Sequence, residues 1–464
     1  MTATLTAPHP AREAGHRTPL SDMQRSMLAH EALEELPVYT MPLCFEITGR
    51  VDADLLERAL HHVVRRHPVL CSLYDGTHAR VLGDAAPMPS LHRPVPDRAP
   101  GRAPGTDPAL AAFLNAPFDL GREVPVRAAL ATTGPDRHLF ALAVHHVAGD
   151  SVSQALMLRD IGAAYAALAR DGRLPRPAPG PDFFAHARAE GPHRAEERPA
   201  EERPAPPPPG GSARGRSGPA PGPARPDGDA AWWAARLRGT APQPYPRRIP
   251  PPEADRCTRI SLGLALDADD TAGIRELART AQVSPSAVLF TAVSHTIAAP
   301  GGGETVIGLP TALRDRPELR AAVGPLLNTL PVRTRLDATA GPAGTVRAHA
   351  AAMEESLTRK ELPYSRILAA AGARHSFDSA PLFLHVVNID HEPLRLRLAG
   401  ARCTLLPVPR AWVVFPAQWE FGWSTVGNVR GELRLSADAF TAEHAHDLAG
   451  RFRRVLTRLL QDLL

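Results

Sequence analysis

Arg137-His-Leu-Phe-Ala-Leu-Ala-Val-His-His-Val-Ala-Gly-Asp-Ser151 is the stretch of sequence from which we infer the fold. Its first half is a near-continuous apolar run, which predicts a strand buried on both faces. From Ser151 to Arg170, apolar residues recur on one side at helical spacing. Ser151 and Gln154 have the spacing of a capping box, and Asp150 lies where a helix entrance favours negative charge. A strand should therefore lead directly into a helix, with two histidines and an aspartate at the junction.

The two histidines at this junction are candidate functional residues. Successive strand side chains point to opposite faces, so His145 and His146 are poorly placed to chelate one metal ion while the strand persists through them. A purely structural explanation also exists, in which His145 and His146 are core residues and Asp150 and Ser151 only start the helix. A second pair, His61-His62, lies inside an amphipathic helical pattern. A histidine pair alone therefore carries little information.

The chain divides into two globular halves on composition. Residues 1–17 read as a flexible tail and 18–188 as a first lobe, and 189–228 form a charged insert rich in Pro, Gly and Arg that is expected to be disordered. Residues 229–464 form a second lobe. Helical patterns over Asp52–Arg66 and Glu443–Leu464, together with a strand pattern over Thr305–Leu309, predict an α/β or α+β fold.

Composition excludes several classes of protein. The 53 basic and 49 acidic residues give a net charge of only +4, and no arginine stripe is interleaved with aromatics, so nucleic-acid binding is not expected. The four cysteines form no Cys-x-x-Cys pair, which argues against a zinc or disulfide framework. No signal peptide and no membrane-spanning run are recognised, so we expect a soluble, cytoplasmic protein without a membrane partner. Because both lobes lie in one chain, we expect a monomer.

The chain resembles the condensation domains of nonribosomal peptide synthetases and related acyltransferases. His145-His146-x-x-x-Asp150 is similar to the His-His-x-x-x-Asp-Gly signature of that family. Further segments match in order along the chain: Leu20–Leu28, Arg66-His67-Pro68-Val69-Leu70, Asp182–Ala185, Arg314–Leu319, Val323–Pro331, Leu362-Pro363-Tyr364 and Ala380–Phe383. The resemblance covers nearly everything from Thr18 to Leu464 except the insert.

This resemblance implies two lobes similar to chloramphenicol acetyltransferase, arranged as a V around a central substrate channel. The implied reaction transfers an acyl or aminoacyl group from the phosphopantetheine arm of a carrier protein to an amine or alcohol acceptor. His146 is the implied catalytic group, with His145 beside it and Asp150 holding the loop that aims it. The site also includes Gly149 and Ser151 near the backbone N–H groups that start the helix. Asn328 is expected in the channel wall or in packing, and no cofactor is expected to be bound intrinsically.

Three residues depart from the family pattern. Ser151 replaces a glycine, and Pro68 replaces a glutamate. Cys71 stands where the family usually has an arginine thought to pair with the motif aspartate, so Asp150 needs another partner, for which Arg65 and Arg66 are candidates. Because both histidines and the aspartate are retained, we expect an active enzyme.

Two alternatives remain open from the sequence. One is a related acyltransferase that uses acyl-CoA or a polyketide carrier and forms an ester. The other is a non-catalytic module that recruits carrier or tailoring proteins, which the changes at Cys71 and Ser151 would suit. An epimerase-type member is disfavoured, as is a heterocyclising one, which would replace the histidines. No carrier-protein or adenylation segment is recognised, so we expect a freestanding enzyme.

Overall fold

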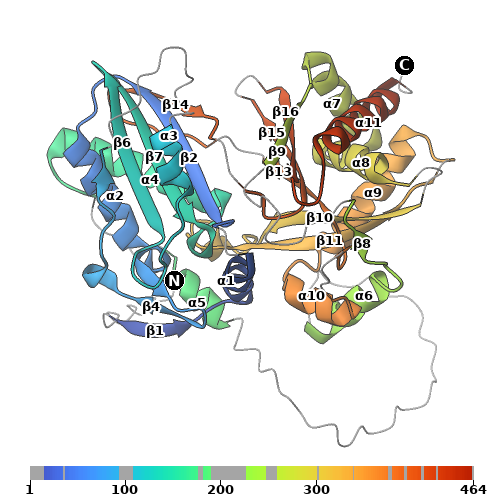
Figure 1. Cartoon of the computed structure of the whole chain (residues 1–464), viewed down its shortest axis with the longest axis horizontal. Helices are drawn as coiled ribbons and strands as arrows, with labels where there is room; N and C mark the ends of the chain where they lie inside the picture. The colour runs from blue at the N-terminus through green and yellow to red at the C-terminus, as the bar shows by residue number, and fades with distance from the viewer. Residues whose placement is uncertain are drawn as a thin grey trace, which may run out of the picture.

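A computed structural model describes residues 15–34, 37–93, 108–175, 181–189, 226–246, 259–299, 303–337, 339–374, 379–390, 394–408, 412–424 and 427–461. These residues form two mixed α/β lobes that stand side by side and meet at their base (Figure 1). Residues 1–14 of the predicted tail and nearly all of the predicted insert lie outside the described residues. The predicted boundaries were wrong at two places, because His16 and Arg17 belong to a strand and a helix begins at Pro226.

The first lobe is built on a sheet in which strand β7 is central. Among the described residues, its five strands follow the order β14 (Arg402–Leu406), β2 (Thr40–Thr48), β7 (Arg137–His145), β6 (Val126–Gly134) and β5 (Leu91–His92). A smaller sheet contains β1 (His16–Pro19), β4 (His78–Val81) and β3 (Ser72–Tyr74). The helices of this lobe are α1 (Asp22–Glu34), α2 (Ala53–Arg66), α3 (Pro108–Asn115), α4 (Ser151–Asp171) and α5 (Phe183–Ala189).

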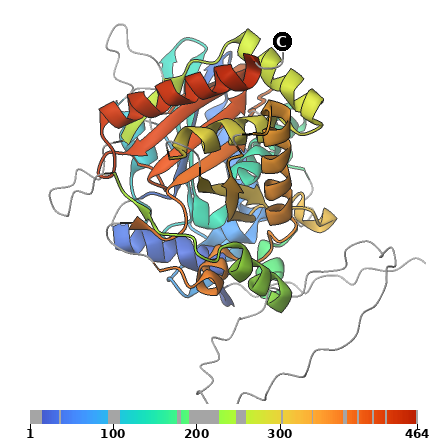
Figure 2. The same ribbon diagram turned by 90° about the vertical axis from the view of Figure 1, so that its right-hand side faces the viewer.

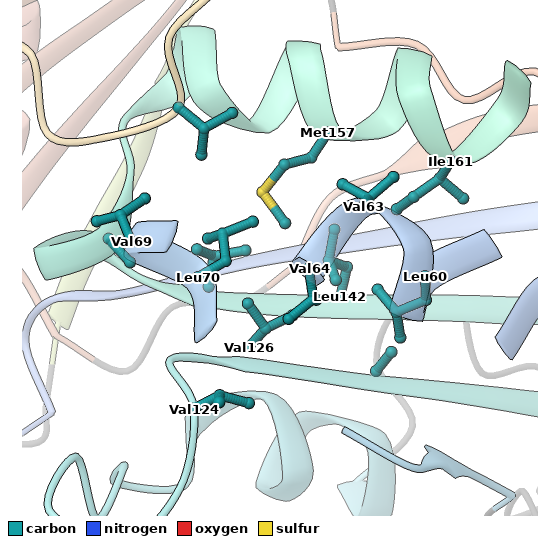
Figure 3. Packing of buried hydrophobic residues seen from close by; sticks show 14 of the residues in the cluster. Leu60, Val63, Val64, Val69, Leu70, Val124, Val126, Leu142, Met157 and Ile161 are labelled. Atoms are coloured by element: carbon teal, nitrogen blue, oxygen red, sulfur yellow. The ribbon is translucent and has the colours of Figure 1, made fainter. Parts of the chain in front are cut away.

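Strand β7 is covered on both faces, which explains its continuous apolar sequence. Leu139 and its alternate neighbours pack against α3, whereas Leu142 and its neighbours pack against α2 and α4. Figure 3 shows Val63 and Val64 of α2 close to Met157 of α4 within this core. The helix predicted from Asp52 begins one residue later, because the Asp52 side chain accepts hydrogen bonds from two backbone N–H groups as its N-cap.

The second lobe carries a larger mixed sheet. Within the described ranges, its six strands follow the order β11 (Leu327–Arg335), β10 (Glu304–Ala312), β13 (His385–Asp390), β15 (Ala417–Trp423), β16 (Val429–Ser436) and β9 (Arg259–Leu264). One face is covered by α7 (Ala268–Ala281), α8 (Pro285–Ile297), α9 (Pro342–Leu357) and α11 (Ala442–Gln461). The other face packs against α6 (Pro226–Arg236) and α10 (Tyr364–Ala371), near the short pair β8 (Gln243–Pro244) and β12 (Ser379–Ala380). Figure 2 shows α11 (red) lying across the strands of this sheet.

Two segments of the second half of the chain cross into the first lobe. Strand β14 pairs antiparallel with β2 and thus completes the first-lobe sheet (Figure 1). The segment that precedes β14 passes close to α4, since a β-carbon at Gly162 of α4 would lie 2.4 Å from the Arg397 carbonyl oxygen. The connection between β10 and β11 also reaches across, and Leu319, Val323 and Leu326 belong to the first-lobe core. Residues 229–464, which the sequence assigned wholly to the second lobe, therefore also supply parts of the first.

Candidate active site

The junction between β7 and α4 is a tight turn. The strand ends at His145, a single 3-10 turn covers His146–Ala148, and α4 begins at Ser151. The pairing of β2 with β7 is extended by one bond, because the His146 N–H donates to the Tyr39 carbonyl at 2.8 Å. The Gln24 amide at the start of α1 donates to the Val147 carbonyl at 2.9 Å and fixes the turn from the opposite side.

His145 is buried, with 1% of its surface exposed. Its Nδ1 accepts a hydrogen bond from the Val147 N–H at 3.1 Å. The ring proton therefore belongs on Nε2, which donates to the Glu31 carboxylate at 2.7 Å. Phe118 contacts the ring edge-on, with centroids 5.8 Å apart. Both ring nitrogens of His145 are thus engaged in holding the turn.

His146 has a different environment, because the turn takes it out of the strand. Its Nδ1 lies 2.7 Å from the Gly149 carbonyl oxygen, which can only accept, so Nδ1 carries the proton. Nε2 is then the basic nitrogen of the neutral ring. The Tyr39 ring lies edge-on at a centroid distance of 6.1 Å. Although His146 keeps some accessible surface, burial of the rest lowers its pKa, and the neighbouring Asp150 charge opposes that shift.

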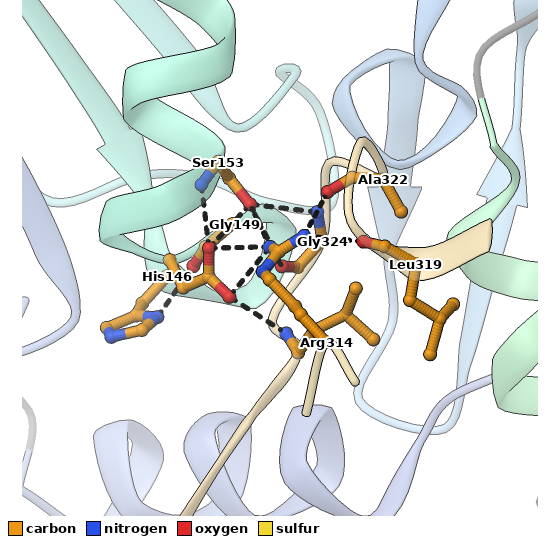
Figure 4. Close-up of polar contacts among 9 residues, drawn as sticks. His146, Gly149, Ser153, Arg314, Leu319, Ala322 and Gly324 are labelled. Atoms are coloured by element: carbon orange, nitrogen blue, oxygen red, sulfur yellow. Dashed lines mark hydrogen bonds and ion pairs between the residues drawn. The ribbon is translucent and has the colours of Figure 1, made fainter. Parts of the chain in front are cut away.

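Asp150 is the residue that joins the two lobes at the site. One of its oxygens caps α4 by accepting from the Ser153 N–H at 2.7 Å. The Arg314 guanidinium, which comes from the second half of the chain, lies 2.8 and 2.9 Å from the two carboxylate oxygens. The Leu326 N–H adds a bond at 3.2 Å. Figure 4 shows Arg314 reaching between Ser153 and Gly324 at this point.

The Arg314 guanidinium is itself held by backbone carbonyls. It donates to Leu319 at 3.0 Å and to Ala322 at 2.6 Å. The Ser153 hydroxyl completes the network, since it accepts from the Gly324 N–H at 3.1 Å and lies 3.0 Å from the Gly324 carbonyl oxygen. The loop between β10 and β11 is therefore fixed to the N-terminus of α4.

Two predictions about the partners of these residues were wrong. Asp150 pairs with Arg314 rather than Arg65 or Arg66; Arg66 instead faces Asp160 at 3.3 Å. Ser151 is not the cap of a Ser-x-x-Gln box, because Asp150 takes the N-cap position and Ser151 becomes the first helical residue. The Gln154 amide donates to the Met41 carbonyl instead, at 3.0 Å. A capping box does occur at α1, where Ser21 and Gln24 bond reciprocally.

The other predicted site residues occupy distinct places. Ser151 is exposed at the first turn of α4, and Gly149 supplies the carbonyl that orients His146. Asn328, at the start of β11, is 1% exposed and uses its whole amide: it donates to the Lys360 and Leu362 carbonyls at 2.8 and 2.7 Å and accepts from the Thr329 and Tyr364 N–H groups. Its side chain therefore holds the second-lobe wall together.

The two departures at residues 68 and 71 lie in the first lobe, where Pro68 is half-buried and Cys71 belongs to the core. Pro68 begins a short 3-10 helix, Pro68–Cys71, where a fixed φ and a missing N–H are both tolerated. Cys71 is buried, and its thiol lies 3.6 Å from the His67 and Pro68 carbonyls. The partner of Asp150 is the Arg314 guanidinium instead of an arginine at residue 71.

A cavity of about 720 Å³ opens between the lobes beside this site. Its first-lobe wall comes from α1, Val38–Tyr39 and Phe183, and its second-lobe wall from Pro325–Thr329, α10, Pro381–Phe383 and Trp412–Pro416. We call it the interlobe cavity. Tyr39 belongs to this wall and also contacts His146, while Leu326 belongs to it and bonds Asp150. Asn328 lines it as well. Among the residues that the structure describes, no cluster of three metal-ligating side chains occurs.

Comparison with known proteins places the chain in a family. The model of the Condensation domain family matches residues 15–203 and 224–463. The chain belongs to that family. The dimodular nonribosomal peptide synthase of Bacillus subtilis (strain 168) is 27% identical over 97% of this chain, which spans 18% of that protein's length. Within the described ranges, no helix of this condensation-domain protein is both long and apolar enough to cross a bilayer.

Two solved structures show the same architecture. The X-domain from teicoplanin biosynthesis superposes with a TM-score of 0.78 at 22% identity, covering 97% of both chains. The first condensation domain of the calcium-dependent antibiotic synthetase, in complex with a substrate analogue, gives 0.73 at 21% identity, again covering 97% of both. These likenesses confirm the predicted fold of two lobes similar to chloramphenicol acetyltransferase, and at this identity they establish the fold alone.

Several residues of the site were missed by the sequence analysis. Arg314 and Gly324 fall in segments that were recognised as family-like, but no role was assigned to them. Glu31, Tyr39 and Ser153 carried no signal that sets them apart from ordinary surface or core residues. Ser153 is close to the histidine turn in the chain, whereas only the pairing of distant segments in the fold brings the other four there.

Proposed function

We propose that this protein is a condensation enzyme of natural-product biosynthesis. It transfers an acyl or aminoacyl group from the phosphopantetheine thioester of a peptidyl or acyl carrier protein to an amine or hydroxyl acceptor, forming an amide or an ester. The observation that carries the proposal is the orientation of His146. The Gly149 carbonyl holds its Nδ1–H, so that Nε2 of a neutral ring is left as the proton acceptor, and the Tyr39 ring beside it lines the interlobe cavity.

In the proposed reaction, the acceptor nitrogen or oxygen attacks the thioester carbonyl carbon. Nε2 of His146 takes the proton from the nucleophile as the new bond forms. The carbon–sulfur bond then breaks, and His146 returns the proton to the departing thiolate of the phosphopantetheine arm. The lowered pKa of His146 favours this role, because the ring is neutral at the start of the reaction near pH 7. Binding both substrates in one channel lowers the barrier further, since oriented reactants save roughly 7–11 kcal/mol.

The remaining motif residues act through position. His145 anchors the turn through Glu31, and Asp150 anchors it to the second lobe through Arg314. The carbonyl oxygen of the substrate becomes negative during the attack. The first N–H groups of a helix have no intrahelical partner, so those of α4, at Ser151 and Val152, are suited to bind that oxygen.

The experiment uses purified protein, S-acyl pantetheine donors and a panel of amine and alcohol acceptors, with product followed by mass spectrometry. Carrier-bound and acyl-CoA donors run beside them to distinguish the acyltransferase that uses free acyl-CoA. His146→Ala should lower the rate of product formation by roughly 10²–10⁴-fold, whereas His62→Ala, from the second histidine pair, should retain the wild-type rate. Product formed equally well by His146→Ala contradicts the mechanism. If no donor gives product while a carrier protein still binds, the protein is a recruitment module instead.

A further inference from the structure

The interlobe cavity has a wall that is rich in aromatic rings, although the chain as a whole is poor in them. Aromatic residues make up 5% of the sequence. Three of the five tyrosines line this cavity, together with Phe183, Phe383, Phe415 and Trp412. Its volume of about 720 Å³ would hold roughly two dozen non-hydrogen atoms, if each takes the ~30 Å³ of a water molecule. The space is therefore that of a medium-sized organic group rather than of a passage for solvent alone.

Three of these rings form a continuous surface in the second-lobe wall. The centroids of Tyr364 and Phe383 lie 5.4 Å apart, and those of Phe383 and Phe415 lie 6.0 Å apart, with interplanar angles of 47° and 48°. These are the separations at which aromatic pairs attract one another. Trp412 also lines the cavity, and its indole N–H is buried without a hydrogen-bond partner among the described residues.

Carboxylates and two histidines, His30 and His186, are the ionisable groups of the wall apart from its tyrosines. No arginine or lysine is among the described residues that line the cavity, although the chain has 53 such residues. Three carboxylates line it: Asp22, Glu361 and Asp438. Arg25 and Arg366 pair with Asp22, and the Ser436 hydroxyl donates to Asp438. A ligand carboxylate would meet these lining carboxylates and, apart from the two histidines, no described lining side chain that can carry a positive charge, whereas a neutral ligand meets no such repulsion.

We propose that the interlobe cavity selects a neutral substrate group bearing an aromatic ring. This inference rests on the proposed function in assigning the group to a condensation substrate. The same ring chemistry can belong to the acyl donor or to the amine acceptor, and the binding experiment distinguishes them. The ring lies against the Tyr364–Phe383–Phe415 surface, and an anionic side chain is excluded.

The experiment measures equilibrium binding to the full chain carrying His146→Ala, which slows turnover, with donor and acceptor probes added separately. The donor probes are phenylacetyl-, cyclohexylacetyl- and succinyl-pantetheine, and the acceptor probe is phenethylamine. Phenylacetyl-pantetheine should bind more tightly than its saturated match, and succinyl-pantetheine should bind most weakly. Phe415→Leu, at a half-buried position, should weaken phenylacetyl binding by roughly 2- to 12-fold, the value of one aromatic pair, and leave the cyclohexyl probe unchanged.

A second variant keeps the test independent of any loss of fold. Ser26 is exposed at the rim of the cavity, so Ser26→Lys introduces a cation without disturbing the core. It should improve succinyl-pantetheine binding roughly 3-fold or more relative to Ser26→Gln, which has similar length and no charge.

The outcomes separate this inference from the proposed function. If phenethylamine alone shows the Phe415→Leu effect, the ring belongs to the acceptor, and the inference stands. The inference is overturned if Phe415→Leu weakens neither phenylacetyl-pantetheine nor phenethylamine, if the succinyl probe binds tightly, or if no probe binds. If the binding order holds and the His146-containing protein forms no product, the inference stands and the condensation function fails.

Discussion

Replacing Arg314 by methionine tests the contact that ties the two lobes together at the site. The Arg314 and Asp150 side chains are 8% and 7% exposed, and both carboxylate oxygens lie within 2.9 Å of one guanidinium nitrogen. Methionine keeps most of the apolar stem but leaves the Asp150 charge buried without its cation. Breaking a buried pair in this way costs about 3–5 kcal/mol. We therefore expect Arg314→Met to lower the free energy of unfolding by that amount.

A double-mutant cycle with Asp150→Asn isolates the pair. Asparagine is also a good N-cap, so the start of α4 survives in that variant. In urea unfolding, the double variant should be more stable than the sum of the two single changes predicts, by about 2 kcal/mol or more. Arg66→Met is the matched control, because Arg66 faces Asp160 and its effect should simply add to that of Asp150→Asn. Additivity within about 0.5 kcal/mol for the Arg314 cycle would refute the reasoning.

Three further changes probe the framework around the site. Asn328→Leu leaves two carbonyls and two N–H groups without their hydrogen-bond partner. It should lower the free energy of unfolding by at least about 3 kcal/mol. An unchanged Tm in thermal unfolding would contradict this. Gly324→Ala places a β-carbon 2.3 Å from Phe183 at a φ of +159° and should destabilise the protein by about 1–3 kcal/mol. Gly263→Ala is the control, because its β-carbon would have nothing within 4 Å. The two urea midpoints should differ accordingly. Burial lowers the pKa of His67 to about 4 from 6.5. Between these two pH values the unfolded state therefore binds more protons than the folded state. The free energy of unfolding should fall as the pH drops from 6.5 to 4, by up to about 1.4 kcal/mol per pH unit. His67→Leu should flatten that slope, and an unaltered slope counts against the assignment.

The elements around the site follow from local patterns in the sequence. The apolar run ending at Val144 and the helical spacing after Ser151 predicted β7 and α4 almost to the residue. The helix cap was misassigned because Asp150 and Ser151 are both favoured N-cap residues, and spacing alone does not choose between them. Asp150 takes the N-cap position in the fold, where its carboxylate also pairs with Arg314.

The partners of the motif could not be predicted from local patterns. Arg314 lies 164 residues from Asp150 in the chain, and β14 joins a sheet whose other strands all precede residue 146. Helical and strand periodicities depend on nearby residues, so they do not indicate which distant segments pair. The glycine at residue 324 is a sequence feature related to this contact. Its positive φ and its position next to Phe183 mark a close approach of two segments. One sequence does not reveal that φ.

The rate of condensation as a function of pH tests most directly whether neutral His146 is the proton acceptor. The single-turnover rate of the wild type, divided at each pH by the rate of His146→Ala, removes the titration of the acceptor itself. Because burial lowers the pKa of His146, this ratio should stay constant from pH 8 down to 6.5 and fall only at a pH below 6.5, as the ring becomes protonated. A ratio near one throughout, or one that rises as the pH falls, would contradict the account.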